Sequence, residues 1–250
     1  MLVTRPSEQS AELVTLLQSE GFATLQLPCI EIHYQQPEKT FTPADFDVVI
    51  FTSYHGVQGM RLLNPFPWKT DKPKLLAIGP ATADQLTGQD QTLIEAPLPP
   101  FNSEALLTTA TLKSGHGRSV AIIKGVGGRE LLKQTLQNRG FTVTCVDTYE
   151  RKLPDVNNDK LESVFLNSPA DIVTITSNEI LQNLIRLAGD RYREHLFRLP
   201  LAVGSSRAAQ LAKEIGFQND TVIARTPGNP GLLEAVKQWT NSKGGIQSYE

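Results

Sequence analysis

The chain is poor in cysteine and histidine. Its 250 residues include two cysteines, Cys29 and Cys145, and four histidines. Two cysteines are too few for a disulfide framework or a cysteine-rich metal site. The histidines lie far apart in the chain and lack the His-x-x-x-His spacing of zinc sites. The sequence therefore predicts neither a disulfide-stabilised domain nor a structural zinc site.

The chain also lacks a long apolar run and an excess of one charge. No stretch approaches the roughly 18–20 apolar residues that cross a bilayer, and residues 1–6 do not resemble a signal peptide. Lys plus Arg number 24 and Asp plus Glu number 26, which gives a net charge of −2. Nucleic-acid binding proteins usually carry a basic excess or stripe. We therefore expect a cytoplasmic protein with no membrane or nucleic-acid partner.

Short apolar runs alternate with amphipathic stretches along the whole chain. Strands are predicted at residues 2–4, 25–32, 47–51, 75–78, 120–123, 142–146, 171–175, 201–203 and 221–224. Helices are predicted at residues 7–20, 82–86, 129–138, 181–187, 206–215 and 232–239. This alternation is typical of an α/β fold, with parallel sheets flanked by helices.

The sequence contains an internal repeat. Four segments match in the same order: 21–22 with 140–141, 47–53 with 171–177, 77–86 with 202–211, and 106–107 with 232–233. The offset between the copies drifts only from 119 to 126 residues. Four ordered matches with so little drift indicate two copies of one α/β unit. We therefore expect two domains of similar fold.

Both copies place hydroxylated residues at the carboxyl ends of predicted strands. Thr52-Ser53 and Thr176-Ser177 follow two equivalent strands. Ligands of parallel sheets bind beyond these ends, and the first N–H groups of the following helix suit a carboxylate or phosphate. For one serine alone, a helix cap is the simpler interpretation. The symmetric pairing favours a ligand cleft.

Two glycine-containing segments also place small or hydroxylated residues at the carboxyl ends of predicted strands. A glycine ends the strand, and small or hydroxylated residues open a helix, in Gly79-Pro-Ala-Thr82 and again in the segment from Gly204. In the second copy Ser205 and Ser206 precede Arg207, which stands where the first copy has threonine. We therefore favour the two serines over Arg207 as ligand-binding residues.

The segment 124–129, Lys-Gly-Val-Gly-Gly-Arg, is the most distinctive of the chain. Its glycines Gly125, Gly127 and Gly128 let the backbone approach a ligand closely. Lys124 and Arg129 add positive charge beside a predicted helix N-terminus. A tight turn with two solvated cations is the alternative interpretation.

The chain does not match common nucleotide-binding or hydrolase motifs. Segment 124–130 is neither a P-loop nor a complete Gly-x-Gly-x-x-Gly, because residue 130 is Glu, although Asp147 lies where a ribose-binding acid would. No Gly-x-Ser-x-Gly elbow is present. His55 has Glu179 as its counterpart in the repeat, which disfavours histidine chemistry.

Tyr149 is either a core or hinge tyrosine or a proton donor, since a phenol stays protonated at neutral pH.

Taken in order, these motifs resemble uroporphyrinogen-III synthases. The resemblance rests on Thr4-Arg5-Pro6, Phe51-Thr52-Ser53, Gly79-Pro-Ala-Thr-Ala83, Gly127-Gly-Arg-Glu130, Tyr149-Glu-Arg151 and Thr176-Ser177. Tyr192-Arg-Glu-His195 is similar to the gamma-proteobacterial members. The resemblance extends to about Trp239, which is almost the whole chain.

The resemblance implies two similar α/β domains joined by a two-stranded hinge, with the active site in the cleft between them. One domain would comprise residues 1–34 plus 152–250 and the other residues 35–151. It implies a cyclising carbon–oxygen lyase of heme and other tetrapyrrole biosynthesis. The enzyme would remove water from hydroxymethylbilane, invert ring D and close uroporphyrinogen III. No metal or organic cofactor is implied; we expect a monomer, with the bilane-forming enzyme as a candidate partner.

The resemblance also assigns roles to residues. Tyr149 would be the catalytic proton donor. The substrate carries eight carboxylates, and a chain with a net charge of −2 needs local donors to hold them. The residues expected to bind substrate are Arg5, Thr52, Ser53, Gly79, Thr82, Lys124, Gly125, Gly127, Gly128, Arg129, Thr176, Ser177, Ser205 and Ser206. A hinged ligand-binding protein and a Rossmann-type nucleotide enzyme are the alternatives.

Overall fold

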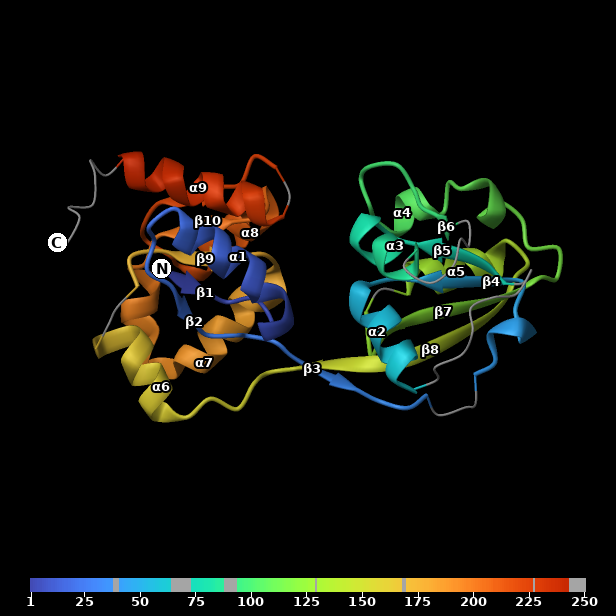
Figure 1. The fold of residues 1–250 in the computed structure, drawn as a ribbon, viewed down its shortest axis with the longest axis horizontal. Coiled ribbons are helices and arrows are strands. Elements are labelled where there is room, and N and C mark those ends of the chain that lie inside the picture. Colours follow the sequence, from blue (N-terminus) through green and yellow to red (C-terminus); the bar gives the residue numbers. More distant parts are fainter. Residues whose placement is uncertain are drawn as a thin grey trace. The chain divides into compact units, whose positions relative to one another are not determined.

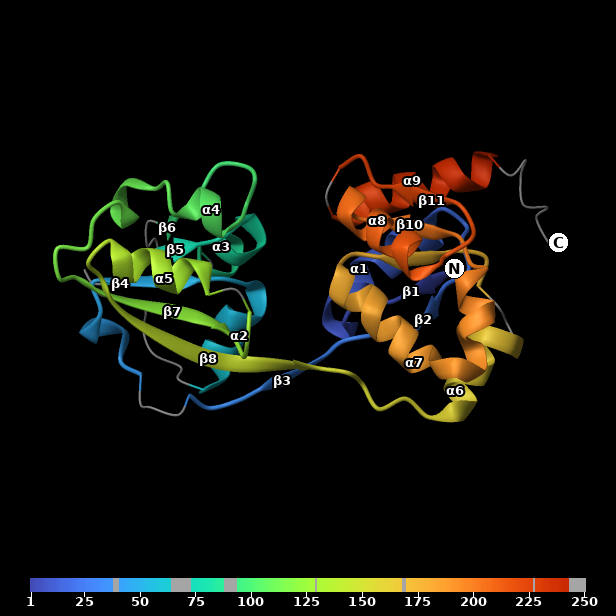
Figure 2. The ribbon, with the colours of Figure 1, turned by 180° about the vertical axis from the view of Figure 1, so that it is seen from behind.

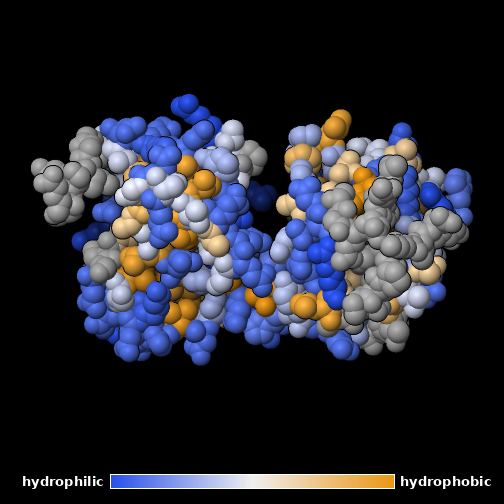
Figure 3. All heavy atoms as spheres, viewed as in Figure 1, coloured by the Kyte–Doolittle hydropathy of each residue, from blue (hydrophilic) through white to orange (hydrophobic). Residues whose placement is uncertain are grey.

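The computed structural model describes residues 1–37, 41–63, 73–87, 94–128, 130–167, 170–226 and 228–242. The chain forms two compact units, Met1–Glu31 with Lys152–Glu250 (unit 1) and Ile32–Arg151 (unit 2). Each unit contains a sheet flanked by helices (Figure 1), which confirms the α/β fold class. The visible face of each unit is mainly hydrophilic (Figure 3). Among the described residues, no helix has both the length and the apolar content to cross a membrane.

The sheet of unit 2 has six strands in the order β3-β8-β7-β4-β5-β6. These strands are β3 (Glu31–Tyr34), β4 (Val48–Phe51), β5 (Lys74–Ala77), β6 (Ile94–Glu95), β7 (Ser119–Gly125) and β8 (Thr142–Lys152). β4 pairs in parallel with both neighbours, and Phe51 lies opposite Ala77 on one side and Ile123 on the other. All of β4 is buried, as expected of a parallel strand covered on both faces.

Helices cover both faces of this sheet. They are α2 (Tyr54–Leu63), α3 (Pro80–Thr87), α4 (Ser103–Leu106) and α5 (Leu131–Asn138), with short 3-10 helices at Pro43–Asp45 and Ala110–Leu112. Phe51 packs in one core cluster with Met60 of α2, and Ile50 packs in another with Leu136 of α5. Because neighbouring β4 residues point to opposite faces, α2 and α5 lie on opposite sides of the sheet (Figures 1 and 2).

The sheet of unit 1 has five strands in the order β11-β10-β9-β1-β2. These strands are β1 (Leu2–Val3), β2 (Leu25–Gln26), β9 (Val173–Ile175), β10 (Leu201–Val203) and β11 (Thr221–Ile223). Its helices are α1 (Ser7–Ser19), α6 (Asn158–Glu162), α7 (Asn178–Phe197), α8 (Ser206–Ile215) and α9 (Asn229–Ser242), and a π-helical turn spans Ser163–Asn167. Leu13 and Leu17 of α1 share a core cluster with Val236 of α9.

The two sheets share one strand order. Strands β9, β10 and β11 correspond to β4, β5 and β6, and β1 and β2 correspond to β7 and β8. The offsets of 124–126 in the sequence repeat relate β4, β5 and β6 to β9, β10 and β11. The offset of 119 relates β1 and β2 to β7 and β8. Unit 2 differs by one added edge strand, β3, for which the described part of unit 1 has no counterpart.

The predicted strand 25–32 is wrong. β2 ends at Gln26 and belongs to the sheet of unit 1, whereas β3 begins at Glu31 and belongs to the sheet of unit 2. Pro28 lies between them and has no N–H to donate to a strand partner. The predicted strand 142–146 is too short, because β8 continues to Lys152. The predicted helix 181–187 is the middle of the first part of α7, which is interrupted at Gly189 (φ 54°).

The chain passes between the units twice, on neighbouring strands. The boundary at 31/32 lies in β3 and the boundary at 151/152 lies near the end of β8; the expected boundaries are 34/35 and 151/152. β3 and β8 are adjacent in the sheet of unit 2, and the N–H of Gln35 donates to the carbonyl oxygen of Thr148 at 3.0 Å. A two-stranded connection therefore joins the units.

Candidate functional site

A cavity of about 210 Å³ lies at the carboxyl ends of the strands of unit 2. This edge is where parallel α/β sheets bind their ligands. Seven of the predicted site residues line the cavity: Thr52, Ser53, Lys124, Gly125, Gly127, Gly128 and Tyr149. Segments that are up to 97 residues apart in the chain, from Thr52 to Tyr149, therefore meet in one place.

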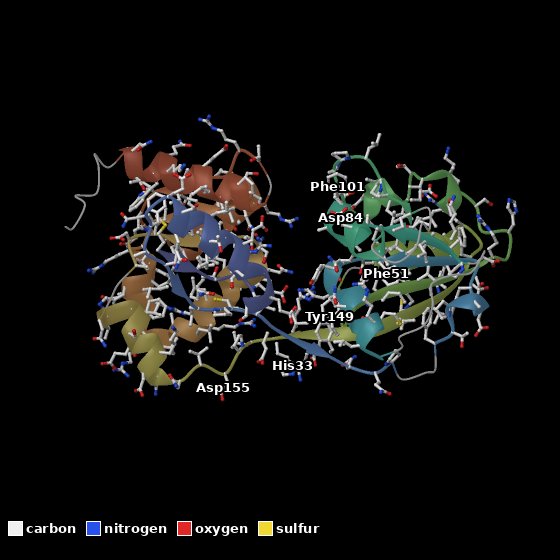
Figure 4. The ribbon with its side chains drawn as sticks, viewed as in Figure 1. His33, Phe51, Asp84, Phe101, Tyr149 and Asp155 are labelled. Atoms are coloured by element: carbon white, nitrogen blue, oxygen red, sulfur yellow. The ribbon has the colours of Figure 1, made fainter. Side chains whose placement is uncertain are left out.

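Tyr149 and Ser53 are joined at the wall of this cavity. The hydroxyl of Tyr149 lies 3.0 Å from Oγ of Ser53, and either group can donate. The same Ser53 Oγ accepts the N–H of Gly56 at 3.0 Å, which satisfies one free donor of the first turn of α2. Ser53 is thus a helix cap and a partner of the tyrosine at once. The side chain of Tyr149 comes from β8 (Figure 4) and the residue is only 3% exposed.

The backbone of β8 changes register beside this tyrosine. Lys124 pairs with Asp147, but the next residue, Gly125, pairs with Tyr149. Thr148 is therefore an extra residue in β8, as in a β-bulge, which commonly redirects a side chain next to a functional site. The N–H of Val126 donates to the carbonyl oxygen of Tyr149 at 2.8 Å and holds the strand after the shift.

Lys124 forms an ion pair inside the site. Its Nζ lies 3.5 Å from Oδ1 of Asp147, and the lysine side chain is 15% exposed. Asp147, the candidate ribose-binding acid of the nucleotide alternative, is thus the partner of this lysine. Lys133 also lines the cavity and lies 3.2 Å from Glu130. Within the described residues, no group of three or more His, Cys, Asp or Glu side chains is arranged to hold a metal ion.

Five polar residues of the lining were not among the predicted site residues. They are Ser103 at the start of α4, Glu130 before α5, Lys133 in α5, and Cys145 and Arg151 on β8. Arg151 lies two residues after Tyr149, so the two-residue period of a strand was an available signal for it. The extra residue Thr148 breaks this period between Cys145 and Tyr149, so spacing alone gave no such signal for Cys145. Burial raises the pKa of the Cys145 thiol, against the opposing charges of Lys124 and Lys133. The guanidinium carbon of Arg151 lies 6.0 Å from the centre of the Tyr149 ring.

Three other predicted residues of unit 2 lie elsewhere or are not described. Gly79 precedes α3 and faces Phe101, whose Cβ would be 3.3 Å from a Cβ at position 79. Thr82 is buried in the first turn of α3, with 4% of its surface exposed. Neither is among the residues that line the cavity. Arg129 lies outside the described residues.

The equivalent serines of unit 1 cap helices. Oγ of Ser177 accepts the N–H of Ile180 at 3.2 Å at the start of α7. Oγ of Ser205 accepts the N–H of Ala208 at 3.3 Å at the start of α8, whose first residue is Ser206. Thr176 follows β9, as Thr52 follows β4. The capping role of these serines is therefore observed, and their role in binding stays a prediction.

Arg5 occupies the position in unit 1 that Lys124 occupies in unit 2, because the repeat offset there is 119. Its guanidinium donates to the side-chain oxygens of Asn229 and Gln9, the latter at 3.1 Å. Asn229 in turn donates to Glu12 at 2.7 Å. Burial lowers the pKa of Arg5, and Glu12 opposes this effect. Arg5 thus connects the end of β1 to α1 and α9.

These features define a class: an α/β protein of two duplicated units, connected by two strands, with a strand-end cavity that contains a buried tyrosine. A family model described as uroporphyrinogen-III synthase HemD matches residues 11–234. The chain belongs to the uroporphyrinogen-III synthase family. This confirms the resemblance predicted from the motifs.

Curated relatives and solved structures agree with this assignment. The chain is 33% identical over 246 residues to the uroporphyrinogen-III synthase of Salmonella typhimurium, covering 95% of this chain and 99% of the relative. It is 32% identical over the same length and coverage to that of Escherichia coli. Its fold is similar to the synthases of Helicobacter pylori (TM-score 0.60, 18% identity, 86% and 93% of the two chains) and Thermus thermophilus (0.58, 18%, 96% and 98%).

Proposed function

We propose that this chain converts hydroxymethylbilane into uroporphyrinogen III and that Tyr149 is its proton donor. The observation that carries the residue assignment is the contact between Tyr149 and Ser53 at the wall of the strand-end cavity. The activity is the one for which the family and the relatives above are named. We further propose that the protein acts as a cytoplasmic monomer and receives its substrate from the bilane-forming enzyme.

The chemistry begins with the loss of the hydroxymethyl oxygen as water. The carbon–oxygen bond breaks while the phenol of Tyr149 transfers its proton to the departing hydroxyl. Ser53, whose oxygen is already fixed by the N–H of Gly56, lies where it can donate to the phenolate that results. A positioned general acid contributes roughly 10²–10⁴ in rate. The remaining task is to hold the bilane in the geometry that inverts ring D, which is an orientation effect.

The cavity offers cations for the substrate carboxylates. Lys124, Lys133 and Arg151 are on its wall, where Lys124 pairs with Asp147 and Lys133 pairs with Glu130, so that three cations face two acids. Since the chain as a whole is slightly acidic, this local charge supplies the attraction that the net charge does not. Backbone N–H groups of Gly127 and Gly128 and of helix N-termini add further donors. Arg5, Thr176, Ser177, Ser205 and Ser206 form the second set of proposed donors, in unit 1.

Titration of the protein with an octacarboxylate tetrapyrrole, uroporphyrin III, tests the binding part of this proposal. Lys124→Gln should weaken binding about 5- to 20-fold, because a charge-assisted hydrogen bond is worth about 1.5–3 kcal/mol before solvent screening. The matched control is Lys113→Gln, an exposed lysine of the same unit, which should bind like the wild type. Equal affinities of Lys124→Gln and wild type would contradict the role of Lys124.

A further inference from the structure

His55 is a buried histidine on α2 behind the cavity. It is 6% exposed and does not belong to the described lining of the cavity. Its Nδ1 lies 3.1 Å from the hydroxyl of Tyr34. Its ring centre lies 5.6 Å from that of Tyr149 and 5.2 Å from that of Tyr54, the latter edge-on. A polar ring is therefore placed beside the proposed proton donor and outside the described lining of the cavity.

Tyr34 comes from β3, the strand that unit 2 adds to the duplicated pattern. The next residue, Gln35, donates its N–H to the carbonyl oxygen of Thr148. β3 is thus fixed to β8 one residue before Tyr149. Through its hydroxyl, Tyr34 also reaches α2 and contacts His55. The backbone of Thr148, next to Tyr149, and the ring of His55 are consequently held by the same edge strand.

The capping residue and the first turn of α2 therefore contact Tyr149 at two points. Ser53 contacts the hydroxyl at 3.0 Å, and His55 contacts the ring. α2 can approach this closely because Gly56 and Gly59 face the sheet: a Cβ at position 59 would be 2.7 Å from the carbonyl oxygen of Thr148. A buried side chain that is hydrogen-bonded at a ring nitrogen has a fixed orientation, and a neighbour packed on it is fixed in turn.

We propose that His55, held by Tyr34, is a positioning residue for Tyr149. It confines the phenol ring so that the hydroxyl stays on Ser53 and directed at the cavity. His55 acts through Tyr149 and touches neither substrate nor reacting atoms. The inference rests on the proposed role of Tyr149 and extends it to a residue that makes the tyrosine effective.

The test is steady-state kinetics with hydroxymethylbilane for His55→Leu, Tyr34→Phe and His55→Asn. Loss of one buried hydrogen bond and of ring confinement should lower kcat about 3- to 10-fold in His55→Leu and Tyr34→Phe. KM should stay within about twofold, because no group that lines the cavity changes. His55→Asn should recover only part of the rate, since its amide can take the place of Nδ1 opposite Tyr34 but does not restore the ring contact with Tyr149.

A merely structural role is distinguished by repeating His55→Leu and Tyr34→Phe in the Tyr149→Phe background. If His55 acts through the hydroxyl of Tyr149, neither substitution should lower kcat further once that hydroxyl is absent. Wild-type kcat in both single variants, or the same fold-loss with and without the hydroxyl, would overturn the inference. If His55→Leu does not fold, Tyr34→Phe carries the test alone, because it removes a single oxygen atom.

The same variants distinguish a failure of the positioning role of His55 from a failure of the proton-donor role of Tyr149. A slow Tyr149→Phe beside fully active His55→Leu and Tyr34→Phe would overturn the positioning role and leave the proton donor in place. A fully active Tyr149→Phe would overturn the proton-donor role of Tyr149, and with it the reason for His55 to position the ring.

Discussion

The ring of Tyr149 occupies the space that a side chain at Gly125 would need. A Cβ atom at position 125 would lie 2.7 Å from Cζ and 2.8 Å from Cε2 of that ring. These separations are well inside carbon–carbon contact distance. The sequence suggests that Gly125 lets a ligand approach closely, but the structure requires a glycine there to accommodate the ring of Tyr149.

Gly125→Ala should displace the ring of Tyr149 and move its hydroxyl away from Ser53. We expect kcat on hydroxymethylbilane to fall by about 10-fold or more, because misplacing a reacting group by about 1 Å can cost 10²-fold. Circular dichroism and the melting temperature show whether the fold is kept. A variant that is folded and has the wild-type kcat would contradict the importance of this contact.

Gly59 should be required for stability rather than for chemistry. A Cβ there would meet backbone and side-chain atoms of Thr148 at 2.7–2.9 Å, so Gly59→Ala must push α2 away from β8. We expect a loss of about 1–3 kcal/mol in the free energy of unfolding, as for other overpacked sites. The control on the same helix is Gly56→Ala, where the nearest atoms are 3.4 Å away. Equal stabilities of the two variants would count against this packing argument.

Ser53 should have separable roles in stability and in catalysis. Ser53→Ala removes the cap of α2 and should cost about 0.5–2 kcal/mol, whereas a glycine at this position costs only a few tenths. Both substitutions remove the partner of the Tyr149 hydroxyl and should lower kcat alike. Urea unfolding and kinetics on the two variants measure both quantities. A Ser53→Gly variant with wild-type kcat would show that Ser53 is only a cap.

Glu95 should make stability depend on pH in the acid range. Burial raises its pKa, but hydrogen bonds from Lys74 and Thr111 outweigh this and hold the pKa below its ordinary value; Lys74 Nζ lies 2.8 Å away. A carboxyl group whose pKa is lower in the folded state than in the unfolded state stabilises the fold at pH values above the unfolded-state pKa of about 4.3. This stabilisation is lost as the pH falls through the folded-state pKa. Since Lys74 is half exposed, Glu95→Gln should cost only about 0.5–1 kcal/mol at pH 7.

Urea unfolding at several pH values checks this prediction. The difference in the free energy of unfolding between wild type and Glu95→Gln should be largest at neutral pH and should become smaller below about pH 4. The control is Glu194→Gln, whose pair with Arg198 is highly exposed and should contribute a few tenths of a kcal/mol at most. A difference that stays constant down to pH 3 would contradict the assignment.

Much of the fold could be predicted because the sequence is duplicated. The repeat offsets of 124–126 and of 119 correspond to two sets of strands whose order is the same in both sheets. Pro28 signals a break in segment 25–32, but apolar residues stand on both sides of it and no charged residue precedes Glu31. The pattern therefore does not show that the two halves join different sheets. Which sheet a strand joins depends on contacts that are remote in sequence.

The duplication identified one part of the site, and the glycine-containing segment 124–128 and the family resemblance identified the other predicted residues of the lining. Thr52 and Ser53 have counterparts in Thr176 and Ser177, so symmetry identified them. Tyr149 has no such counterpart: at the offset of 119 its position in unit 1 is Ile30. The same asymmetry explains why comparison of the copies gave no functional role to His55. Its partner Tyr34 lies on β3, which the sheet of unit 1 lacks among its described strands.

The most direct test of the central claim is the isomer ratio formed from freshly generated hydroxymethylbilane. The porphyrinogens are oxidised, and types I and III are separated by chromatography for wild type, Tyr149→Phe and an enzyme-free control. The account predicts mainly type III from the wild type. For Tyr149→Phe it predicts a rate lower by about 10²-fold or more, with some type III still formed because the cavity is intact. Wild-type rates in Tyr149→Phe would contradict the proton donor, and only type I at the spontaneous rate from the wild type would contradict the synthase activity itself.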